Sequence, residues 1–250
     1  MMLSDSHCHL DIYPPEELTR VLARASANNV DVIVSMGMDL ESSAENIRLA
    51  RSHEVVLAAV GIHPWNAVPP SPEVRRQLYG LARKEQVAAI GEIGLDYVRN
   101  PETKEIQKDL LRYELSLARE TGLPVSLHCR QAHRDMMEIL RKETSSGIKG
   151  SVHGFSGNLE ELKDWLDLGF CISIGFRGFL VNEVAGLAEV VTEIPLERLL
   201  TETDAAGSGQ PAGPADVLLV AQRLASLRKV STDEIADAAT ANLKRLHKKH

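Results

Sequence analysis

The sequence predicts an α/β protein of the (β/α)8 barrel class, also called a TIM barrel, and three observations predict it. Short apolar runs alternate with longer amphipathic stretches along the chain, which is typical of parallel strands joined by crossover helices. Several runs are almost continuous in Val, Ile, Ala and Leu, for example Val87-Ala88-Ala89-Ile90, as in strands covered on both faces. Eight such runs in 250 residues favour a closed barrel over an open sheet.

Each expected strand is a short apolar run followed by a helical pattern. The eight ranges are 3–7, 30–37, 55–61, 87–93, 124–129, 148–153, 170–175 and 198–203. Pro14-Pro15-Glu16-Glu17 opens the first helix, because proline is tolerated and acidic residues are favoured in a first turn. Ser231, with Glu234 three residues later, predicts the start of the last helix. No internal repeat or linker is recognisable, so we expect one domain over residues 1–250.

Composition limits the location and the partners of the protein. The chain is 44% hydrophobic and 25% charged, and its net charge of −7 disfavours broad, non-specific binding to a nucleic-acid duplex. No apolar run approaches the roughly 20 residues of a membrane span, and no signal stretch follows Met1. Cys8, Cys129 and Cys171 lie in apolar stretches and are expected to be buried thiols. We therefore expect a cytoplasmic protein without a membrane partner or an obligatory protein partner.

Candidate metal ligands recur at the ends of the expected strands. His7 and His9 flank Cys8, and alternate residues of an extended chain point to the same side, so both imidazoles can reach one ion. The later candidates are Glu92, His128, His153 and Asp204. A single polar residue at a strand end more often caps or hydrogen-bonds than binds metal. The joint pattern, at the strand ends where barrel active sites lie, predicts a metal-dependent hydrolase.

The segments around these residues resemble the motifs of the TatD family of metal-dependent deoxyribonucleases, within the amidohydrolase-like barrels. The matching segments, in order, are Asp5-Ser6-His7-Cys8-His9-Leu10, Gly61-Ile62-His63-Pro64, Gly91-Glu92-Ile93-Gly94-Leu95-Asp96-Tyr97, Leu127-His128-Cys129-Arg130-Gln131-Ala132-His133, His153-Gly154-Phe155-Ser156-Gly157 and Leu200-Thr201-Glu202-Thr203-Asp204. They span nearly the whole chain. The resemblance implies that His7, His9, Glu92 and Asp204 hold one ion and that Glu92, His128 and His153 hold the other, with Glu92 bridging.

The implied chemistry explains why these residue types are needed. Two metals roughly 3.5–4 Å apart can clamp the attacking and leaving oxygens of a phosphoryl transfer and activate a water molecule. Glu92 and Asp204 are then the catalytic carboxylates, and Asp204 is also a candidate to accept the proton of that water. Four imidazoles and two carboxylates suit Zn, Mn, Co or Ni, and Mg is compatible where substrate oxygens complete the coordination.

Three further residues are candidates for contacts around the metals. The resemblance places His63 near the scissile phosphate, and a structural hydrogen bond is the alternative. Arg130 follows His128 by two residues and could grip a phosphate oxygen or form an ion pair with a helix carboxylate. Asp96 could orient a ligand, or bond to the backbone of a turn after Gly94.

The sequence thus favours a deoxyribonuclease or phosphodiesterase that cleaves DNA ends or short single strands, with the DNA or other phosphodiester bound locally. An alternative is hydrolysis of a cyclic amide, an ester or an aminoacyl ester of RNA, because related barrels use similar metals on carbonyl carbon. A third hypothesis is an inactive barrel that serves as a binding protein. Its motivation is the segment after Asp204, which lacks the Pro and the Arg or Asn usual in the family's motif.

Overall fold

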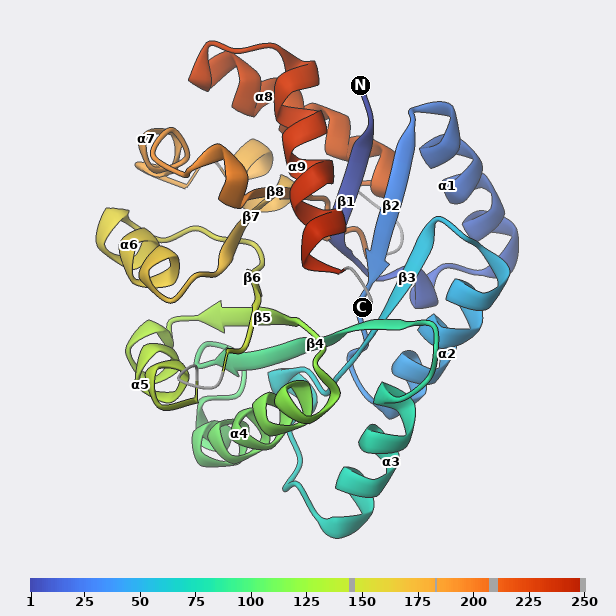
Figure 1. Ribbon diagram of the computed structural model, residues 1–250, viewed down its shortest axis with the longest axis vertical. Coiled ribbons are helices and arrows are strands. Elements are labelled where there is room, and N and C mark those ends of the chain that lie inside the picture. The colour runs from blue at the N-terminus through green and yellow to red at the C-terminus, as the bar shows by residue number, and fades with distance from the viewer. Residues whose placement is uncertain (144–146, 183, 207–210, 248–250) are drawn as a thin grey trace. The chain divides into compact units, whose positions relative to one another are not determined.

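The structure is a computed structural model, and it describes residues 1–143, 147–182, 184–206 and 211–247 (Figure 1). The chain forms two compact units, one made of Met1–Ser35 with residues 153–247 and the other of Met36–Val152. Strands and helices alternate through each unit, as the apolar periodicity predicts.

The first unit contains four parallel strands. Its strands are β1 Leu3–Cys8, β2 Val30–Ser35, β7 Cys171–Gly175 and β8 Leu199–Glu202. Its helices are α1 Pro15–Ala27, α6 Leu159–Asp167, α7 Leu187–Val190, α8 Val217–Arg228 and α9 Thr232–Leu246. β1 pairs with β2 and β7 with β8, and Thr201 Oγ1 on β8 donates to the Ser4 carbonyl on β1 at 3.2 Å. The strand ends of β1 and β8 therefore lie side by side.

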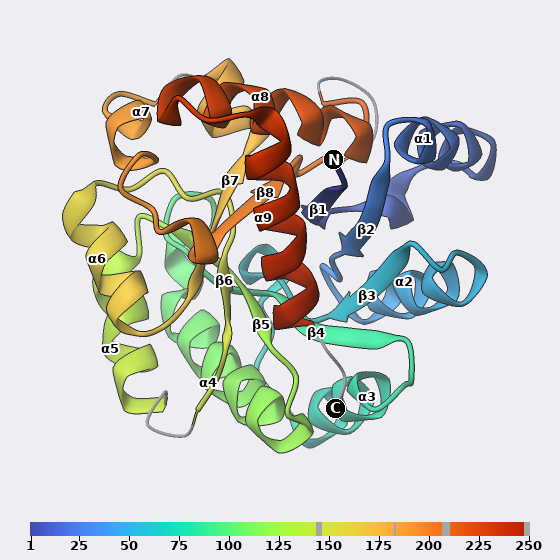
Figure 2. The same ribbon diagram turned by 45° about the horizontal axis from the view of Figure 1, so that its top comes forward.

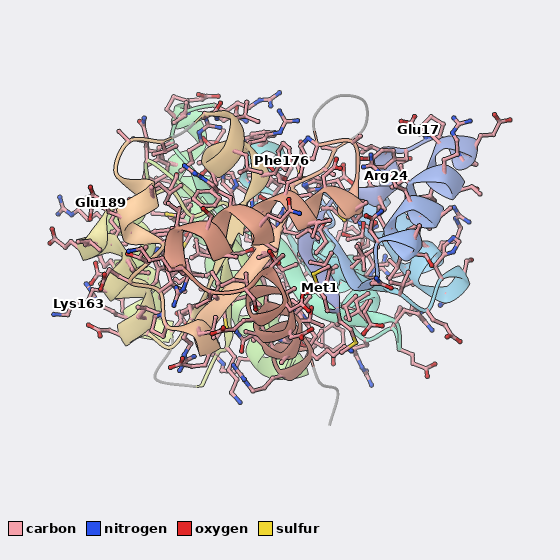
Figure 3. All side chains as sticks on the ribbon, turned by 90° about the horizontal axis from the view of Figure 1, so that it is seen from above. Met1, Glu17, Arg24, Lys163, Phe176 and Glu189 are labelled. Carbon is pink, nitrogen blue, oxygen red and sulfur yellow. The ribbon has the colours of Figure 1, made fainter. Side chains whose placement is uncertain are left out.

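Capping and amphipathic residues explain the helices of this unit. Proline occupies the first turn of α1, and the Ser231 side chain accepts the Glu234 N–H at the start of α9, so both predicted helix starts are confirmed. α9 runs along β1 and β8 (Figure 2). Figure 3 shows Glu17 and Arg24 on α1, and Arg24 reaches Asp216 Oδ2 at 3.0 Å.

The second unit contains the other four strands, which pair in parallel in chain order. They are β3 Val56–Val60, β4 Val87–Asp96, β5 Val125–Arg130 and β6 Gly150–Val152. Its helices are α2 Leu40–Ser52, α3 Pro72–Ala82, α4 Lys104–Thr121 and α5 His133–Glu143. The predicted strands are thus all present, with ends that differ by a few residues. β4 runs on to Asp96, so Glu92 lies inside a strand, whereas β1 stops at Cys8 and His9 lies just beyond it.

The pairing of β4 with β5 is irregular where the polar residues lie. Its register shifts between Ile90 and Ile93, the interval that contains Glu92, and such bulges re-aim side chains next to functional sites. Gly94 then pairs with His128 at a φ of +146°, and a Cβ on Gly94 would lie 2.0 Å from the His128 carbonyl oxygen. Only glycine allows this approach, which brings the His128 backbone against β4.

The cysteines and the apolar segments complete the comparison with the sequence. Cys8 and Cys171 are buried as predicted, but Cys129 is only half-buried, because it lies at the end of β5 where the strand emerges. Within the described residues, no helix has both the length and the apolar character to cross a bilayer. The single domain and the cytoplasmic location stay predictions.

Candidate metal centre

A first cluster of possible ligands lies in the first unit, formed by His7, His9 and Asp204. One ligand atom from each residue lies within 4.8 Å of the others. The Asp204 Oδ1 atom is 3.5 Å from His9 Nε2 and 3.8 Å from His7 Nε2. Both histidines are buried, so the sequence-predicted pair does share one site with the aspartate.

Backbone hydrogen bonds between β1 and the segment after β8 hold this cluster together. The Asp204 N–H donates to the His7 carbonyl at 2.9 Å, and the His9 N–H donates to the Ala205 carbonyl at 2.8 Å. Asp204 itself has a φ of +53°, a conformation that non-glycine residues adopt mainly in turns and at functional sites. This left-handed backbone conformation of Asp204 directs its carboxylate toward the imidazoles of His7 and His9.

Asp5 ties the same two segments together from within β1. Its Oδ1 accepts the Thr203 N–H at 2.9 Å and the His7 N–H at 3.3 Å, and its Oδ2 accepts the Thr203 hydroxyl. Complete burial raises the pKa of Asp5 to about 8, although these hydrogen bonds act in the opposite direction. Asp5 thus fixes the backbone of His7 and that of Thr203, the residue before Asp204.

Asp204 is an ionised carboxylate. Its burial acts to raise its pKa, but the hydrogen bond from His9 and the charges of His153, His7 and His9 outweigh burial and lower the pKa to about 2. The group therefore offers a negative oxygen at any pH near neutrality.

His153 joins this cluster from the end of β6. Its ring stacks on that of His7, with centroids 3.8 Å apart and planes 10° from parallel. Beside it, the fully buried Glu202 accepts the Gly154 N–H at 2.6 Å through Oε1, which also lies 3.4 Å from His153 Nδ1. Glu202 was not among the predicted site residues, although it stands two residues before Asp204 in the same matching segment.

A second cluster lies in the second unit, formed by His63, Glu92 and His128. The Glu92 Oε1 atom is 2.9 Å from His128 Nδ1 and 3.1 Å from His63 Nε2. Glu92 and His63 are almost completely buried, and His128 is partly so. The structure therefore brings two of the predicted ligands together, with His63 beside them.

The hydrogen bonds of His63 define its protonation. Its Nδ1 accepts the Trp65 backbone N–H at 3.0 Å, so in the neutral ring the proton is on Nε2, which then donates to Glu92. His63 in this arrangement orients the carboxylate. Of the two roles that the sequence left open, the structural hydrogen bond is present.

Asp96 connects the second cluster to the loop after β4. Its Oδ2 accepts the Trp65 indole N–H at 2.7 Å and lies 3.1 Å from His128 Nε2, while its Oδ1 accepts the backbone N–H groups of Val98 and Arg99. Burial acts to raise the Asp96 pKa, but these bonds, led by that of His128, hold it well below its usual range. Of the two alternatives for Asp96, bonding to a turn is present, and Asp96 also lies against His128, a predicted ligand.

The donors fit transition-metal ions. Zinc lies about 2.0–2.2 Å from nitrogen and oxygen ligands, so two donors on one ion are roughly 3–3.5 Å apart. The separations of Asp204 Oδ1 from His9 Nε2, 3.5 Å, and of Glu92 Oε1 from His128 Nδ1, 2.9 Å, are close to that range. A carboxylate with imidazoles also suits Zn, Mn, Co or Ni better than Ca.

Arg130 lies outside the second cluster. It is the exposed last residue of β5 and pairs in register with Asp96 of β4. Most of the altered loop after Asp204, residues 207–210, lies outside the described residues.

Comparison with known proteins agrees with this geometry. The family model for the TatD-related DNases matches residues 4–248. The chain belongs to this family. Its relatives include a protein of Bacillus subtilis described as the uncharacterized metal-dependent hydrolase YabD, 34% identical over 98% of both chains. Another is the 3'-5' ssDNA/RNA exonuclease TatD of Klebsiella pneumoniae, 40% identical over 74% of this chain and 70% of the relative.

A solved TatD homologue also has the same fold. The crystal structure of YJJV from Escherichia coli K12 superposes with a TM-score of 0.89, at 32% identity, over 98% of this chain and 97% of that one. The predicted TIM-barrel fold class is thereby confirmed. This TatD-family chain is a metal-dependent hydrolase.

Proposed function

We propose that the chain is a metal-dependent phosphodiesterase that cleaves DNA ends or short single strands. The observation that carries the proposal is the pair of buried clusters, each of which places a carboxylate oxygen among imidazole nitrogens within 4.8 Å. The description of the Klebsiella relative as a single-strand exonuclease supports the choice of substrate.

The proposed ligands are those that the motifs imply. They are His7, His9, Glu92, His128, His153 and Asp204, for two divalent ions per chain drawn from Zn, Mn, Mg, Co or Ni. Such ions, when bound, supply positive charge for the phosphate oxygens and make water a usable nucleophile near neutral pH. Four of these ligands belong to the first unit and two to the second.

The residues of the chain hold the reacting groups and the proton. Asp204 is ionised, so an oxygen of its carboxylate can accept the proton of the attacking water. Glu92 receives a hydrogen bond from His63 Nε2, which fixes the direction of its Oε1 atom. Asp204 and Glu92 are thus the proposed catalytic carboxylates, with His63 as a positioning residue for Glu92.

The substrate is proposed to contact the protein locally. A net charge of −7 opposes wide contact with a phosphate backbone, which favours the end of a strand over the middle of a long duplex. Arg130, exposed at the end of β5, stays a candidate for a phosphate contact.

The direct test is hydrolysis of a 3'-labelled single strand with manganese. We expect metal-dependent release of nucleotides, abolished by a chelator and by His128→Ala. His53→Ala changes a histidine at the C-terminal end of α2 that belongs to neither cluster, so it is the matched control and should retain full activity. Turnover that persists with the chelator and in His128→Ala would remove the proposal.

A substrate panel separates this proposal from its alternatives. Phosphodiesters, carboxyl esters and cyclic amides, each with several metals, should show a preference for the phosphodiester. Preference for a carbonyl substrate would favour the amidohydrolase alternative. Failure to bind metal at micromolar concentration, measured by calorimetry and elemental analysis, would favour an inactive binding protein.

A further inference from the structure

An exposed arginine is stacked on a tryptophan beside the second cluster. The Arg99 guanidinium carbon lies 4.1 Å from the centroid of the Trp65 ring. Within the described residues, no carboxylate forms an ion pair with this guanidinium, in contrast to Arg48 and Arg76, which pair with glutamates three residues away. Arg99 therefore presents a positive charge without an ion-pair partner among the carboxylates of the described residues.

Asp96 holds both members of the stack. Its Oδ1 accepts the Arg99 N–H at 3.0 Å and its Oδ2 accepts the Trp65 indole N–H at 2.7 Å. Asn100 adds a bond from its Nδ2 to the Trp65 carbonyl at 2.9 Å. Because the ring and the arginine backbone are already fixed, a ligand that binds the guanidinium meets a partly ordered side chain and loses less conformational entropy.

The stack adjoins the proposed reaction site. The Trp65 ring centroid is 4.6 Å from that of His63 and 6.2 Å from that of His128. The Asp96 oxygen that holds Trp65 also lies 3.1 Å from His128 Nε2. The Arg99 guanidinium and the imidazoles of the second cluster therefore both lie next to the Trp65 ring.

We propose that Arg99, supported by Trp65, binds a second phosphate of the substrate strand, next to the phosphate that is cleaved. A guanidinium stacked on an indole keeps its N–H groups directed outward, and their planar fork matches two phosphate oxygens. On a protein of net charge −7, an arginine stacked on Trp65, with no ion-pair partner among the described carboxylates, supplies the local attraction that a strand needs. This inference rests on the proposed function and defines its substrate as a chain with more than one phosphate.

The test compares two substrates with the whole protein and manganese. One is a short single strand of DNA, and the other is bis-para-nitrophenyl phosphate, which has a single phosphate. For Arg99→Gln we expect KM for the strand to rise about tenfold, the loss of one charge-assisted contact, with kcat unchanged. KM for the small diester should not change.

Two additional measurements isolate the phosphate contact. The slope of log KM against log salt for the strand should fall by about 0.7 in Arg99→Gln, the amount expected for one phosphate contact on a single strand. Arg99→Lys keeps the charge and loses the fork, so it should retain the salt slope with an intermediate KM. Arg48→Gln removes an exposed, paired arginine and should match the wild type with both substrates.

The outcomes distinguish this inference from the proposed function. If the wild type cleaves the strand and Arg99→Gln has the same KM and salt slope, the second phosphate site is wrong and the phosphodiesterase stands. Equal losses with both substrates would make Arg99 a structural residue and would also overturn the inference. If the wild type cleaves neither substrate, the proposed function and the inference fall together.

Discussion

His128 faces Asp96 through one ring nitrogen and Glu92 through the other. The distances are 3.1 Å from Nε2 to Asp96 Oδ2 and 2.9 Å from Nδ1 to Glu92 Oε1. A neutral imidazole has one N–H. If this N–H is on Nε2 and donates a hydrogen bond to Asp96, the lone pair of Nδ1 faces Glu92. Asp96 thereby selects the form of His128 that can bind a metal together with Glu92.

Asp96→Asn should weaken metal binding at the second cluster. The amide lacks the charge that favours the Nε2–H form of His128, and changes to such outer partners typically cost about 10–100-fold in metal affinity. Calorimetric titration of the metal-free protein with zinc or manganese measures this loss. Asp109→Asn, which removes an exposed aspartate paired with Arg112, is the control and should bind as the wild type does. Equal affinities for Asp96→Asn and the wild type would contradict the assigned role.

The strands were predictable because their apolar runs record burial on both faces. The strand ends were less so: β4 continues to pair with β5 through Asp96, where the side chain of Gln107, on α4, also bonds to the Asp96 N–H and carbonyl. A contact between residues eleven positions apart in the chain leaves no mark on local periodicity. The same limit applies to His9, which lies beyond β1 yet reaches Asp204 because the backbone of Ala205 holds it.

The site residues were predictable where a motif carried them, and the residues that support them were not. His7, Glu202 and Asp204 all stand in recognisable segments, but the roles of Glu202 and Arg99 depend on contacts that only the folded chain displays. Glu202 fits because a glycine stands at position 175, and Arg99 depends on the turn that Asp96 closes. The segment that carries Asp204 also contains Glu202, whereas nothing in the sequence pattern indicates the stack on Trp65.

Gly175→Ala should disturb the first cluster through Glu202. A Cβ at this last residue of β7 would lie 2.8 Å from Glu202 Oε1, the atom that accepts the Gly154 N–H next to His153. Overpacking of this kind costs roughly 1–3 kcal/mol in unfolding free energy. Urea unfolding measures the cost, and metal titration should show weaker binding in the first cluster.

Gly178→Ala is the matched control, because a Cβ at this position would have no atom within 4 Å. A tolerated Gly175→Ala, with normal stability and metal binding, would show that Glu202 can move freely.

Glu114→Gln should be more stable than the wild type, by an amount that grows as the pH rises. Glu114 lies fully buried on α4 and accepts the Ile62 N–H at 2.8 Å, and burial raises its pKa well above the usual range despite that bond. A raised acid pKa means that stability is complete below the unfolded-state value, near about 4.3, and falls as the pH climbs toward the folded-state value. Gln keeps the acceptor and cannot ionise, so the fall disappears.

Denaturant unfolding at a series of pH values measures this difference. The advantage of Glu114→Gln should grow by up to about 1.4 kcal/mol per pH unit while the wild-type carboxyl stays protonated in the fold and ionised in the unfolded chain. Glu120→Gln, on the exposed face of the same helix, should leave the pH dependence as it is. Parallel curves for Glu114→Gln and the wild type would mean that the buried carboxyl does not titrate abnormally.

Metal binding at the first cluster should lose affinity in acid because of its histidines, with Asp204 unaffected. The pKa of Asp204 is lowered to about 2, so its carboxylate stays ionised well below neutral pH and its contribution fades only as the pH falls toward that value. Imidazoles must release their protons to bind a metal, and free imidazole side chains titrate near about 6.5. The stabilisation of the protein by added metal, about 2.7 kcal/mol at a hundred times Kd, should therefore decline from neutral pH toward pH 5 or so.

Thermal unfolding with and without manganese measures this stabilisation as a shift in Tm. His9→Ala is expected to reduce the shift at every pH. A metal-dependent shift in Tm that stays constant across this range would exclude histidine ligands.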